Sequence, residues 1–221
     1  MFPRQVRAVV FDMDGLLVDS EVVVRQALFD AAEAMGYEMS HDLFQQMVGR
    51  PRVENHRLAM AHFGEAFPYS DWETRVATQM RAASICLKAG VIELLDHLDQ
   101  QRLPRAIATS SNRFIVDRHL GDHDLAARFD AIVAAEDVKR HKPNPDPYLK
   151  AAELLGVDPR HCLALEDSHN GVRAAHAAGM MTVMVPDLLE PTDEMHGLCV
   201  HIAASLHAVE AMLRANGGKA E

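Results

Sequence analysis

Two aspartates, Asp12 and Asp14, stand at the end of the apolar run VRAVVFDMD. A carboxylate at the end of a buried strand loses hydration, so its position is costly unless the charge is used there. A second acidic pair, Glu166 and Asp167, ends another apolar run, CLALED. Four acids that follow two apolar runs in this way indicate a charged site at the ends of strands.

Hydroxyl and amide side chains follow a further apolar run, PRAIATS. They are Thr109, Ser110, Ser111 and Asn112. A lysine, Lys142, precedes a proline in the loop KRHKPNPDP. Ligands of open α/β sheets bind outside the carboxyl ends of the strands. We therefore expect these side chains to lie with the four acids at one edge of a sheet.

Each of these residue types suits one part of phosphoryl transfer. Carboxylates that converge without His or Cys suit a hard cation, and Mg²⁺ is the cofactor we expect. Hydroxyl groups, backbone amides and a lysine can hold phosphate oxygens, and an aspartate can be the nucleophile. Asp12 can sit at the metal and Asp14 one step further out, where a second acid can protonate a leaving oxygen and later activate water.

The elements that position these side chains alternate along the chain. Short apolar runs rich in β-branched residues predict five buried strands, at residues 6–12, 104–110, 129–135, 162–167 and 181–186. Three helices are predicted between them, with Pro at a start and Gly at the ends, at residues 90–101, 146–156 and 168–179. Strands that alternate with helices predict the α/β class, with a doubly wound parallel sheet.

Residues 19–88 break this alternation, because they contain no convincing strand. They hold four helical stretches separated by glycines, at residues 21–36, 40–49, 52–64 and 71–90. A helical block that begins directly after the first strand is best explained as an inserted cap. We therefore expect an all-helical cap domain at residues 17–88. Residues 1–16 and 89–221 would then form the α/β catalytic core.

The composition argues against several partners. The 221 residues can bury a sizeable core, and the net charge of −10 disfavours a nucleic-acid partner but not a small anionic substrate. Three cysteines without CxxC spacing favour a reduced, cytoplasmic protein. No signal-peptide pattern or membrane-length apolar run is present, so we expect no membrane partner. We expect a monomer or a weak homo-oligomer.

Four segments together resemble a known family. DMDG, ATSSN, KPNPDPY and LEDSHNGVRAAHAAGM are similar, in order and spacing, to the four motifs of the haloacid dehalogenase-like (HAD) phosphohydrolases. The helical insertion after the first motif matches that family's cap. The likeness runs from about Val6 to Pro186. The DxDG pattern alone is weak, but the four motifs together are specific, and they imply a Rossmann-like core.

The resemblance implies a role for each matching residue. Asp12 would be the nucleophile, and Asp14 would be the general acid and base, with its backbone carbonyl on Mg²⁺. Thr109 and Lys142 would bind the transferred phosphoryl group. Glu166 and Asp167 would complete the metal site with Asp12.

Further residues are predicted to bind substrate. Ser110, Asn112 and Gly15 lie beside the motif residues. In relatives, an arginine of the loop GRPR in the cap contacts the distal phosphate or acid group of the substrate. Arg52 matches that arginine best, and Arg50 lies close to it.

Within the family, the chain resembles the β-phosphoglucomutase-like and sugar-phosphate phosphatase branch. The mutases carry a histidine on the first cap helix, where this chain has Val24. That difference favours hydrolysis, so we predict a Mg²⁺-dependent phosphatase acting on a small phosphorylated metabolite, a sugar phosphate, with a phosphosugar mutase as the alternative. The second acid, Asp14, argues against true dehalogenation. Lys88 is the only cap lysine and lies at the hinge, which disfavours Schiff-base chemistry.

Structural explanations and other protein classes compete with this prediction. A receiver domain also uses an aspartyl-phosphate, but it is shorter and has no helical cap, and a regulator with a decayed site would not keep the full acid set. The methionines of the cap, Met35, Met39, Met47 and Met60, are expected in its core. Acid and hydroxyl pairs after strands can instead form turns or cap helices, which is the structural alternative for Asp12–Asp14, Glu166–Asp167 and Thr109–Ser110. The structural alternative for Lys142, Arg50 and Arg52 is an ordinary surface charge.

Overall fold

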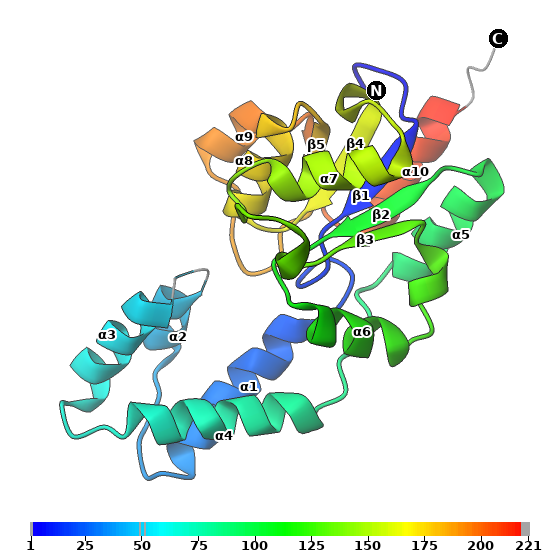
Figure 1. Ribbon diagram of the computed structural model, residues 1–221. Coiled ribbons are helices and arrows are strands. Elements are labelled where there is room, and N and C mark those ends of the chain that lie inside the picture. Colours follow the sequence, from blue (N-terminus) through cyan, green and yellow to red (C-terminus); the bar gives the residue numbers. More distant parts are fainter. Residues whose placement is uncertain (1, 49, 51, 218–221) are drawn as a thin grey trace. The chain divides into compact units, whose positions relative to one another are not determined.

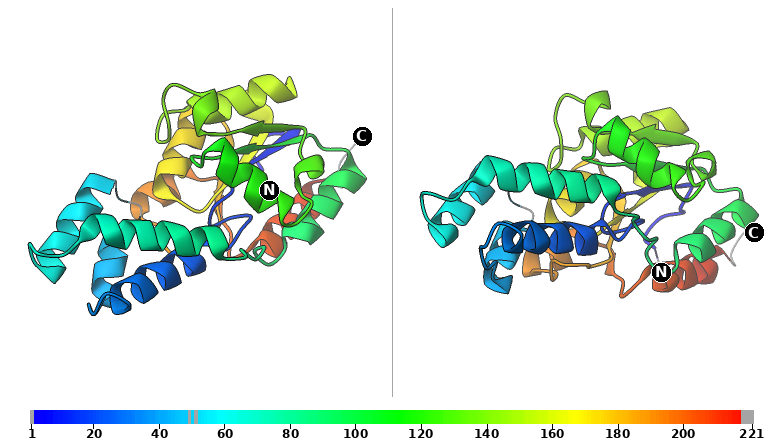
Figure 2. Two further views of the ribbon diagram at one scale, coloured as in Figure 1. Left: turned by 60° about the horizontal axis from the view of Figure 1, so that its bottom comes forward. Right: turned by 90° about the horizontal axis from the view of Figure 1, so that it is seen from below.

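The computed structural model describes residues 2–48, 50 and 52–217 of the chain. Contacts divide the chain into two compact units, Met1–Asp19 with Cys86–Glu221, and Ser20–Ile85. Figures 1 and 2 show that the first unit combines a sheet with helices and that the second consists of helices and loops. The predicted α/β class with an inserted helical segment is confirmed.

A six-stranded parallel sheet forms the centre of the α/β unit, in the strand order β3-β2-β1-β4-β5-β6. The strands are β1 (Ala8–Phe11), β2 (Arg105–Ala108), β3 (Ala131–Val133), β4 (Cys162–Glu166), β5 (Met181–Met184) and β6 (His201–Ile202). All residues of β1, β2, β4 and β5 are buried. Burial on both faces explains why these runs are apolar without alternation.

Helices cover both faces of this sheet. They are α5 (Val91–Gln101), α6 (Arg113–Gly121), α7 (Asp146–Leu155), α8 (His169–Ala177), α9 (Asp193–Leu198) and α10 (Leu206–Gly217), with short 3₁₀ turns at Ala126–Arg128, Ala135–Asp137 and Pro159–His161. On one face, Tyr148 of α7 and Ala174 of α8 pack with Val10 of β1. On the other face, α5 packs against α10 (Figure 2).

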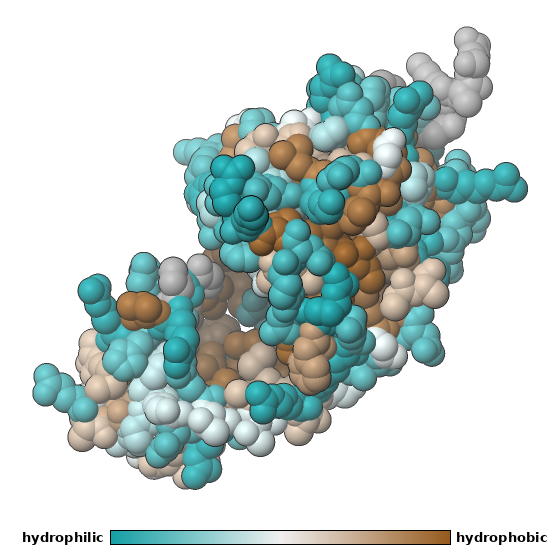
Figure 3. Space-filling model, in the orientation of Figure 1, coloured by the Kyte–Doolittle hydropathy of each residue, from teal (hydrophilic) through white to brown (hydrophobic). Residues whose placement is uncertain are grey.

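The five predicted strands and three predicted helices of this unit are all present. Strand β6 was not predicted, because its His201 is exposed and its Ile202 only half-buried, so no buried run marks it. Edge strand β3 is also only partly covered, and Figure 3 shows hydrophobic surface over this side of the unit. Helix α6 starts at Arg113, so its N-terminal cap lies two residues beyond Ser110. Its cap is Asn112, not Thr109 or Ser110.

The described residues of the second unit form four helices, where the sequence predicted four. They are α1 (Ser20–Glu33), α2 (His41–Met47), α3 (Arg52–Phe63) and α4 (Tyr69–Ala82). The four expected core methionines lie in or against its hydrophobic cluster. Trp72 anchors that cluster, since its ring is buried and its Nε1 donates to the backbone oxygen of Leu28 at 3.1 Å.

The connections between the two units belong to the α/β unit. The backbone amide of Asp19 donates to Cys86 O at 2.8 Å, and that of Lys88 donates to Leu17 O at 2.9 Å. These bonds tie residues 17–19 and 86–88 together, so the compact helical unit begins at Ser20 and ends at Ile85, inside the predicted segment 17–88. That this unit acts as a cap stays a prediction.

In the part of the chain that the structure describes, no helix is both long and apolar enough to cross a membrane.

Candidate active site

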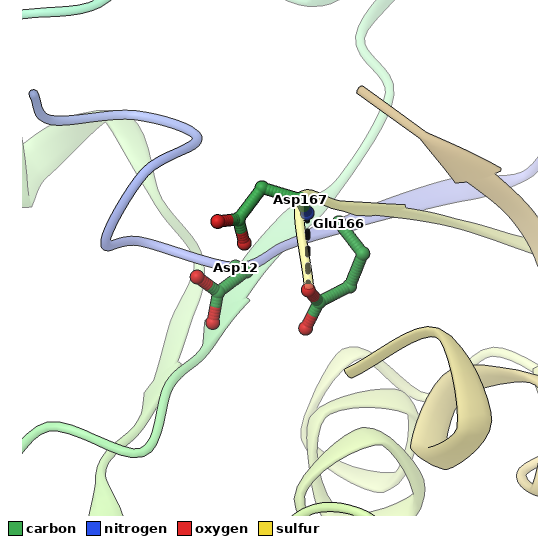
Figure 4. Close-up of side chains that lie close together, drawn as sticks. All are labelled: Asp12, Glu166 and Asp167. Atoms are coloured by element: carbon green, nitrogen blue, oxygen red, sulfur yellow. Dashed lines mark hydrogen bonds between the residues drawn. The ribbon is translucent and has the colours of Figure 1, made fainter. Parts of the chain in front are cut away.

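The site forms where β1 and β4 end side by side. Phe11 of β1 is in register with Leu165 of β4, and the amide of Asp12 donates to Leu165 O at 2.9 Å. Parallel pairing therefore brings Asp12 beside Glu166 and Asp167, although more than 150 residues separate the strands in sequence. Figure 4 shows the three carboxylates converging from these strand ends.

One oxygen from each of these three carboxylates lies within 4.8 Å of the others. Asp12 and Glu166 are buried and Asp167 is half-buried. An all-oxygen donor set of carboxylates is the kind that Mg²⁺ prefers. The residues present therefore fit the predicted metal, with Asp12, Glu166 and Asp167 as the side chains that could hold it.

Lys142 joins two of these acids. Its Nζ lies 2.5 Å from Asp12 Oδ1 and 2.5 Å from Glu166 Oε1, and it sits over the ring of Tyr148, 5.0 Å from the ring centroid. The hydroxyl of Tyr148 also donates to Glu166 Oε1, at 2.7 Å. Since the Lys142 side chain is only 5% exposed, its charge acts on Asp12 with little screening by water.

Glu166 is held by its own strand end as well. Its Oε2 accepts from the amides of Asp167 and Ser168, each at 3.1 Å, and from the Ser168 hydroxyl at 3.0 Å. Both oxygens of Glu166 therefore already accept hydrogen bonds from the protein. The geometry makes Glu166 an anchor for Lys142 in addition to a candidate metal ligand.

Two glycines make room for these carboxylates. A Cβ on Gly171 of α8 would lie 1.7 Å from Glu166 Oε1, so only glycine admits the Glu166 side chain there. Gly15 has φ +80°, and a Cβ on it would lie 2.4 Å from Asp167 Oδ2. The predicted substrate-binding residue Gly15 is thus required by its backbone conformation and by the approach of Asp167.

The clustered acids perturb one another's pKa. Burial raises the pKa of Asp12 to about 7, with Glu166 and Asp14 adding to the rise and Lys142 opposing it. Burial and the charges of Glu166 and Asp12 hold the pKa of Asp167 well above its ordinary value. Burial alone would also raise the pKa of Glu166, but the adjacent Lys142 lowers it. A bound cation would favour the ionised forms of Asp12 and Asp167.

Asp14 lies apart from the three-carboxylate group and faces the segment after β2. Its Oδ2 accepts from the hydroxyl of Ser111 at 2.6 Å, and its Oδ1 lies 3.6 Å from Nδ1 of His119. Asp14 is half-buried, whereas the predicted nucleophile Asp12 is buried. The two aspartates of the first motif therefore stand in different surroundings.

The remaining predicted residues after β2 differ in their contacts. Thr109 is buried, its amide donates to Val133 O, and its Oγ1 accepts from the amide of Ser111 at 3.0 Å. Ser110 is exposed. Asn112 caps α6, because its Oδ1 accepts from the amide of Ile115 at 3.0 Å. The structure gives Asn112 this structural role, and its binding of substrate stays a prediction.

Arg50 and Arg52 belong to the helical unit. Arg52 makes a two-bond ion pair with Glu73, at 2.6 and 2.5 Å, and Arg50 pairs with Glu54 at 3.1 Å. Both arginines line a cavity of about 750 Å³ within this unit. Side chains that share the lining are mostly apolar or aromatic and include Val24, Leu28, Phe44, Tyr69, Trp72 and Met80.

Several residues of the site were not predicted from the sequence. Tyr148 lies in the predicted helix 146–156, whose pattern does not indicate that the side chain meets Glu166, and His119 lies on α6, a helix that the sequence analysis did not predict. Lys88 lies in the segment that connects the two units, and the sequence did not predict the contacts of its side chain. Its Nζ donates to Asp187 Oδ1 at 2.7 Å and lies 3.5 Å from Asp19 Oδ1, within the α/β unit.

The parallel sheet and the acid set at the carboxyl ends of its strands place the candidate site where open α/β sheets bind their ligands. A family model described as haloacid dehalogenase-like hydrolase matches residues 9–185. The chain belongs to the haloacid dehalogenase-like hydrolase family.

Named relatives support the enzyme class. The chain is 34% identical over 192 residues to a Drosophila melanogaster protein assigned as a pseudouridine-5'-phosphatase, covering 83% of each chain. It is 34% identical over 193 residues to hexitol phosphatase B of Escherichia coli (strain K12), covering 83% of this chain and 85% of that one. The predicted enzyme class, a phosphoric monoester hydrolase, is confirmed.

The fold is shared with a solved structure. A Thermotoga maritima protein assigned as a β-phosphoglucomutase superposes with a TM-score of 0.82 at 28% identity, over 95% of this chain and 99% of that one. The predicted resemblance and the fold class are confirmed by this likeness together with the family model.

Proposed function

We propose that the protein is a Mg²⁺-dependent phosphatase that hydrolyses the phosphate ester of a small metabolite, a sugar phosphate, through an aspartyl-phosphate on Asp12. One observation carries the proposal. The carboxylate of Asp12 meets those of Glu166 and Asp167 within 4.8 Å, and Lys142 Nζ lies 2.5 Å from it. The residues proposed as nucleophile, cation ligands and fixed positive charge thus share one strand edge.

In the first step, a carboxylate oxygen of Asp12 attacks phosphorus, and the bond from phosphorus to the leaving oxygen breaks. Asp14 gives its proton to that leaving oxygen, so that an alcohol departs. In the second step, Asp14 takes a proton from water, and the resulting oxygen attacks the phosphorus held on Asp12. The Asp12–phosphorus bond breaks, inorganic phosphate leaves, and both aspartates return to their starting state.

The surrounding residues stabilise the group that is transferred. Mg²⁺ bound by Asp12, Asp167 and Glu166, with the Asp14 carbonyl, would neutralise negative charge on the phosphoryl oxygens. Lys142 holds a fixed positive charge beside Asp12, and the Thr109 hydroxyl is assigned to a phosphoryl oxygen. Glu166 keeps Lys142 in place through the 2.5 Å contact.

Substrate recognition is assigned to residues of both units. Ser110, Asn112 and the backbone at Gly15 are proposed to bind near the phosphoryl group. Arg50 and Arg52 of the helical unit are proposed to contact the distal phosphate or acid group of the substrate, as the resemblance to the family implies. The named phosphatase relatives refer to hexitol and to pseudouridine 5'-phosphate, which supports a polyhydroxylated leaving group.

A phosphosugar mutase is the second candidate, since one solved relative is assigned as a β-phosphoglucomutase. In that reaction the alcohol, not water, takes the phosphoryl group from Asp12. Val24 of α1 stands where the mutases carry a histidine, and a valine has no donor to hold Asp14 away from water. This difference favours hydrolysis as the main reaction.

We further propose a cytoplasmic protein with no nucleic-acid or membrane partner, in a monomeric or weakly associated state. The net charge of −10 and three free cysteines support the first two assignments.

The test is a panel of phosphorylated metabolites, assayed for released phosphate with Mg²⁺ and with a chelator. We expect turnover of sugar phosphates that chelation abolishes and that Asp12→Asn abolishes. Full turnover by Asp12→Asn, or after chelation, would refute the proposal. An isomerised phosphosugar as the main product, dependent on a bisphosphate primer, would replace phosphatase by mutase.

A further inference from the structure

Two histidines of the described residues, His97 and His119, are buried with an Nδ1 that has no hydrogen-bond partner, and His119 is the one that faces Asp14. It lies on α6, its side chain is 5% exposed, and its Nδ1 is buried without a hydrogen-bond partner within the described residues. That nitrogen is 3.6 Å from Asp14 Oδ1. A buried ring nitrogen without a partner is uncommon, because its desolvation is not compensated. Here it is aimed at the carboxylate that the proposed reaction uses for proton transfer.

The other oxygen of Asp14 has a donor on the same segment. Ser111 Oγ donates to Asp14 Oδ2 at 2.6 Å, and Ser111 directly precedes Asn112, the cap of α6. The capping bond from Ile115 N to Asn112 Oδ1 fixes the start of the helix. The segment from Ser111 through α6 therefore presents one side chain to each oxygen of Asp14.

The Asp14–His119 contact is slightly longer than a hydrogen bond, and 3.6 Å leaves no room for a water between the two atoms. A small rotation of either side chain closes it. A neutral imidazole ring carries one N–H, on either of its two nitrogens. The carboxylate of Asp14 favours the tautomer with that hydrogen on Nδ1.

We propose that Ser111 and His119 are positioning residues that hold the carboxylate of Asp14 in the orientation needed for proton transfer. The inference rests on the proposed function, in which Asp14 is the general acid and base. Neither side chain is assigned a contact with substrate. Their loss would let Asp14 sample other rotamers and would slow proton transfer without weakening phosphate binding.

A purely structural role for His119 is the competing explanation, since its neighbours on α6, Val116 and Leu120, are buried in the same way. A leucine at this position would pack equally well and would leave no polar atom without a partner. The two roles differ in their effect on different leaving groups. Only a positioning role makes the defect depend on how much the leaving oxygen needs a proton.

The experiment compares kcat/KM for an alkyl phosphate and for p-nitrophenyl phosphate, because kcat/KM reports the step in which the leaving group departs. An alkoxide needs protonation as it leaves, whereas p-nitrophenolate needs little. We expect His119→Leu to lower kcat/KM for the alkyl ester about 10- to 100-fold, part of the roughly 100- to 10,000-fold that acid–base groups contribute. The value for p-nitrophenyl phosphate should change by less than about 3-fold.

Three further variants make the result decisive. His119→Asn places an amide donor near the position of Nδ1 and should recover most of the alkyl activity. Ser111→Ala should show the same selective loss and does not depend on the folding of a His119 variant. Val116→Ala, a buried truncation on the same helix without a contact to Asp14, should not change the ratio between the two substrates.

Asp14→Asn separates failure of this inference from failure of the proposed function. If Asp14→Asn lowers kcat/KM equally for both substrates, the assigned acid role is wrong. Suppose instead that Asp14→Asn lowers kcat/KM for the alkyl ester only. If His119→Leu and Ser111→Ala then lower kcat/KM equally for both substrates, the positioning role is overturned. Selective losses in all three variants, with recovery in His119→Asn, support it.

Discussion

Gly171→Ala tests the packing around Glu166 most sharply, because the conflict is defined by coordinates. The new Cβ would lie 1.7, 1.9 and 2.2 Å from the three carboxyl atoms of Glu166. Ordinary contacts between such atoms are about 3.5 Å, so the carboxyl group must move by well over 1 Å. That movement breaks its bonds with Lys142, Tyr148 and Ser168.

The expected loss of stability follows from these bonds. Breaking a buried ion pair costs about 3–5 kcal/mol. The Gly-to-Ala change within a helix returns about 1 kcal/mol. We therefore expect the free energy of unfolding to fall by about 2–4 kcal/mol, measured by urea unfolding followed by circular dichroism.

A matched glycine and a double mutant serve as controls. A Cβ added to Gly197 of α9 would meet no atom within 4 Å among the described residues beyond its own helix backbone, so Gly197→Ala should be neutral or slightly stabilising. Glu166→Ala removes the atoms that clash, so Gly171→Ala should cost much less in that background. A loss below about 1 kcal/mol for Gly171→Ala alone, or additive losses in the double mutant, would refute the packing explanation.

Three further outcomes are expected. Lys142→Met should lower kcat by about 100- to 1,000-fold in the metabolite assay, because it removes a positive charge beside Asp12, and unchanged kcat would contradict its role. The pKa of Asp12 is raised from 3.8 to about 7 in the folded protein, so the metal-free protein should lose stability as pH rises through this range. Thermal melts at several pH values should show this loss, and added Mg²⁺ should offset it most above pH 7. Asp12→Asn should make the stability depend less on pH. Arg52→Ala should raise KM with little change in kcat, whereas Arg57→Ala on the same helix should change neither, and equal effects of both would argue against a binding role for Arg52.

The strand-end acids could be predicted because parallel pairing leaves little freedom. Once β1 and β4 are neighbours, Asp12 and Glu166 must follow them at the same edge. The sequence could not show which groups donate hydrogen bonds to each carboxylate oxygen of Glu166. Its bonds to Tyr148 and Ser168 depend on how α7 and α8 pack on the sheet.

Two residues at α6, Asn112 and His119, have contacts that could not be predicted from the sequence. Asn112 was grouped with the hydroxyls that precede it, but the helix begins there and uses its side chain as a cap. His119 was not predicted, because no helix was predicted at residues 113–121 and because Asp14, which its side chain approaches, lies more than 100 residues away in sequence. The helical unit is shorter than the predicted segment 17–88 for a similar reason. Backbone hydrogen bonds between residues 17–19 and 86–88 join these segments to the α/β unit, and such bonds between residues far apart in sequence could not be predicted.

The most direct test of the central claim is the site of covalent phosphorylation. Asp14→Asn should slow the hydrolysis step, so the protein should accumulate phosphate when mixed with a substrate that has a good leaving group and with Mg²⁺. Peptide mapping by mass spectrometry should then find the phosphoryl group on Asp12, and Asp12→Asn should abolish it. Phosphate on another residue, or turnover without any covalent phosphoryl group in rapid-quench samples, would contradict the mechanism.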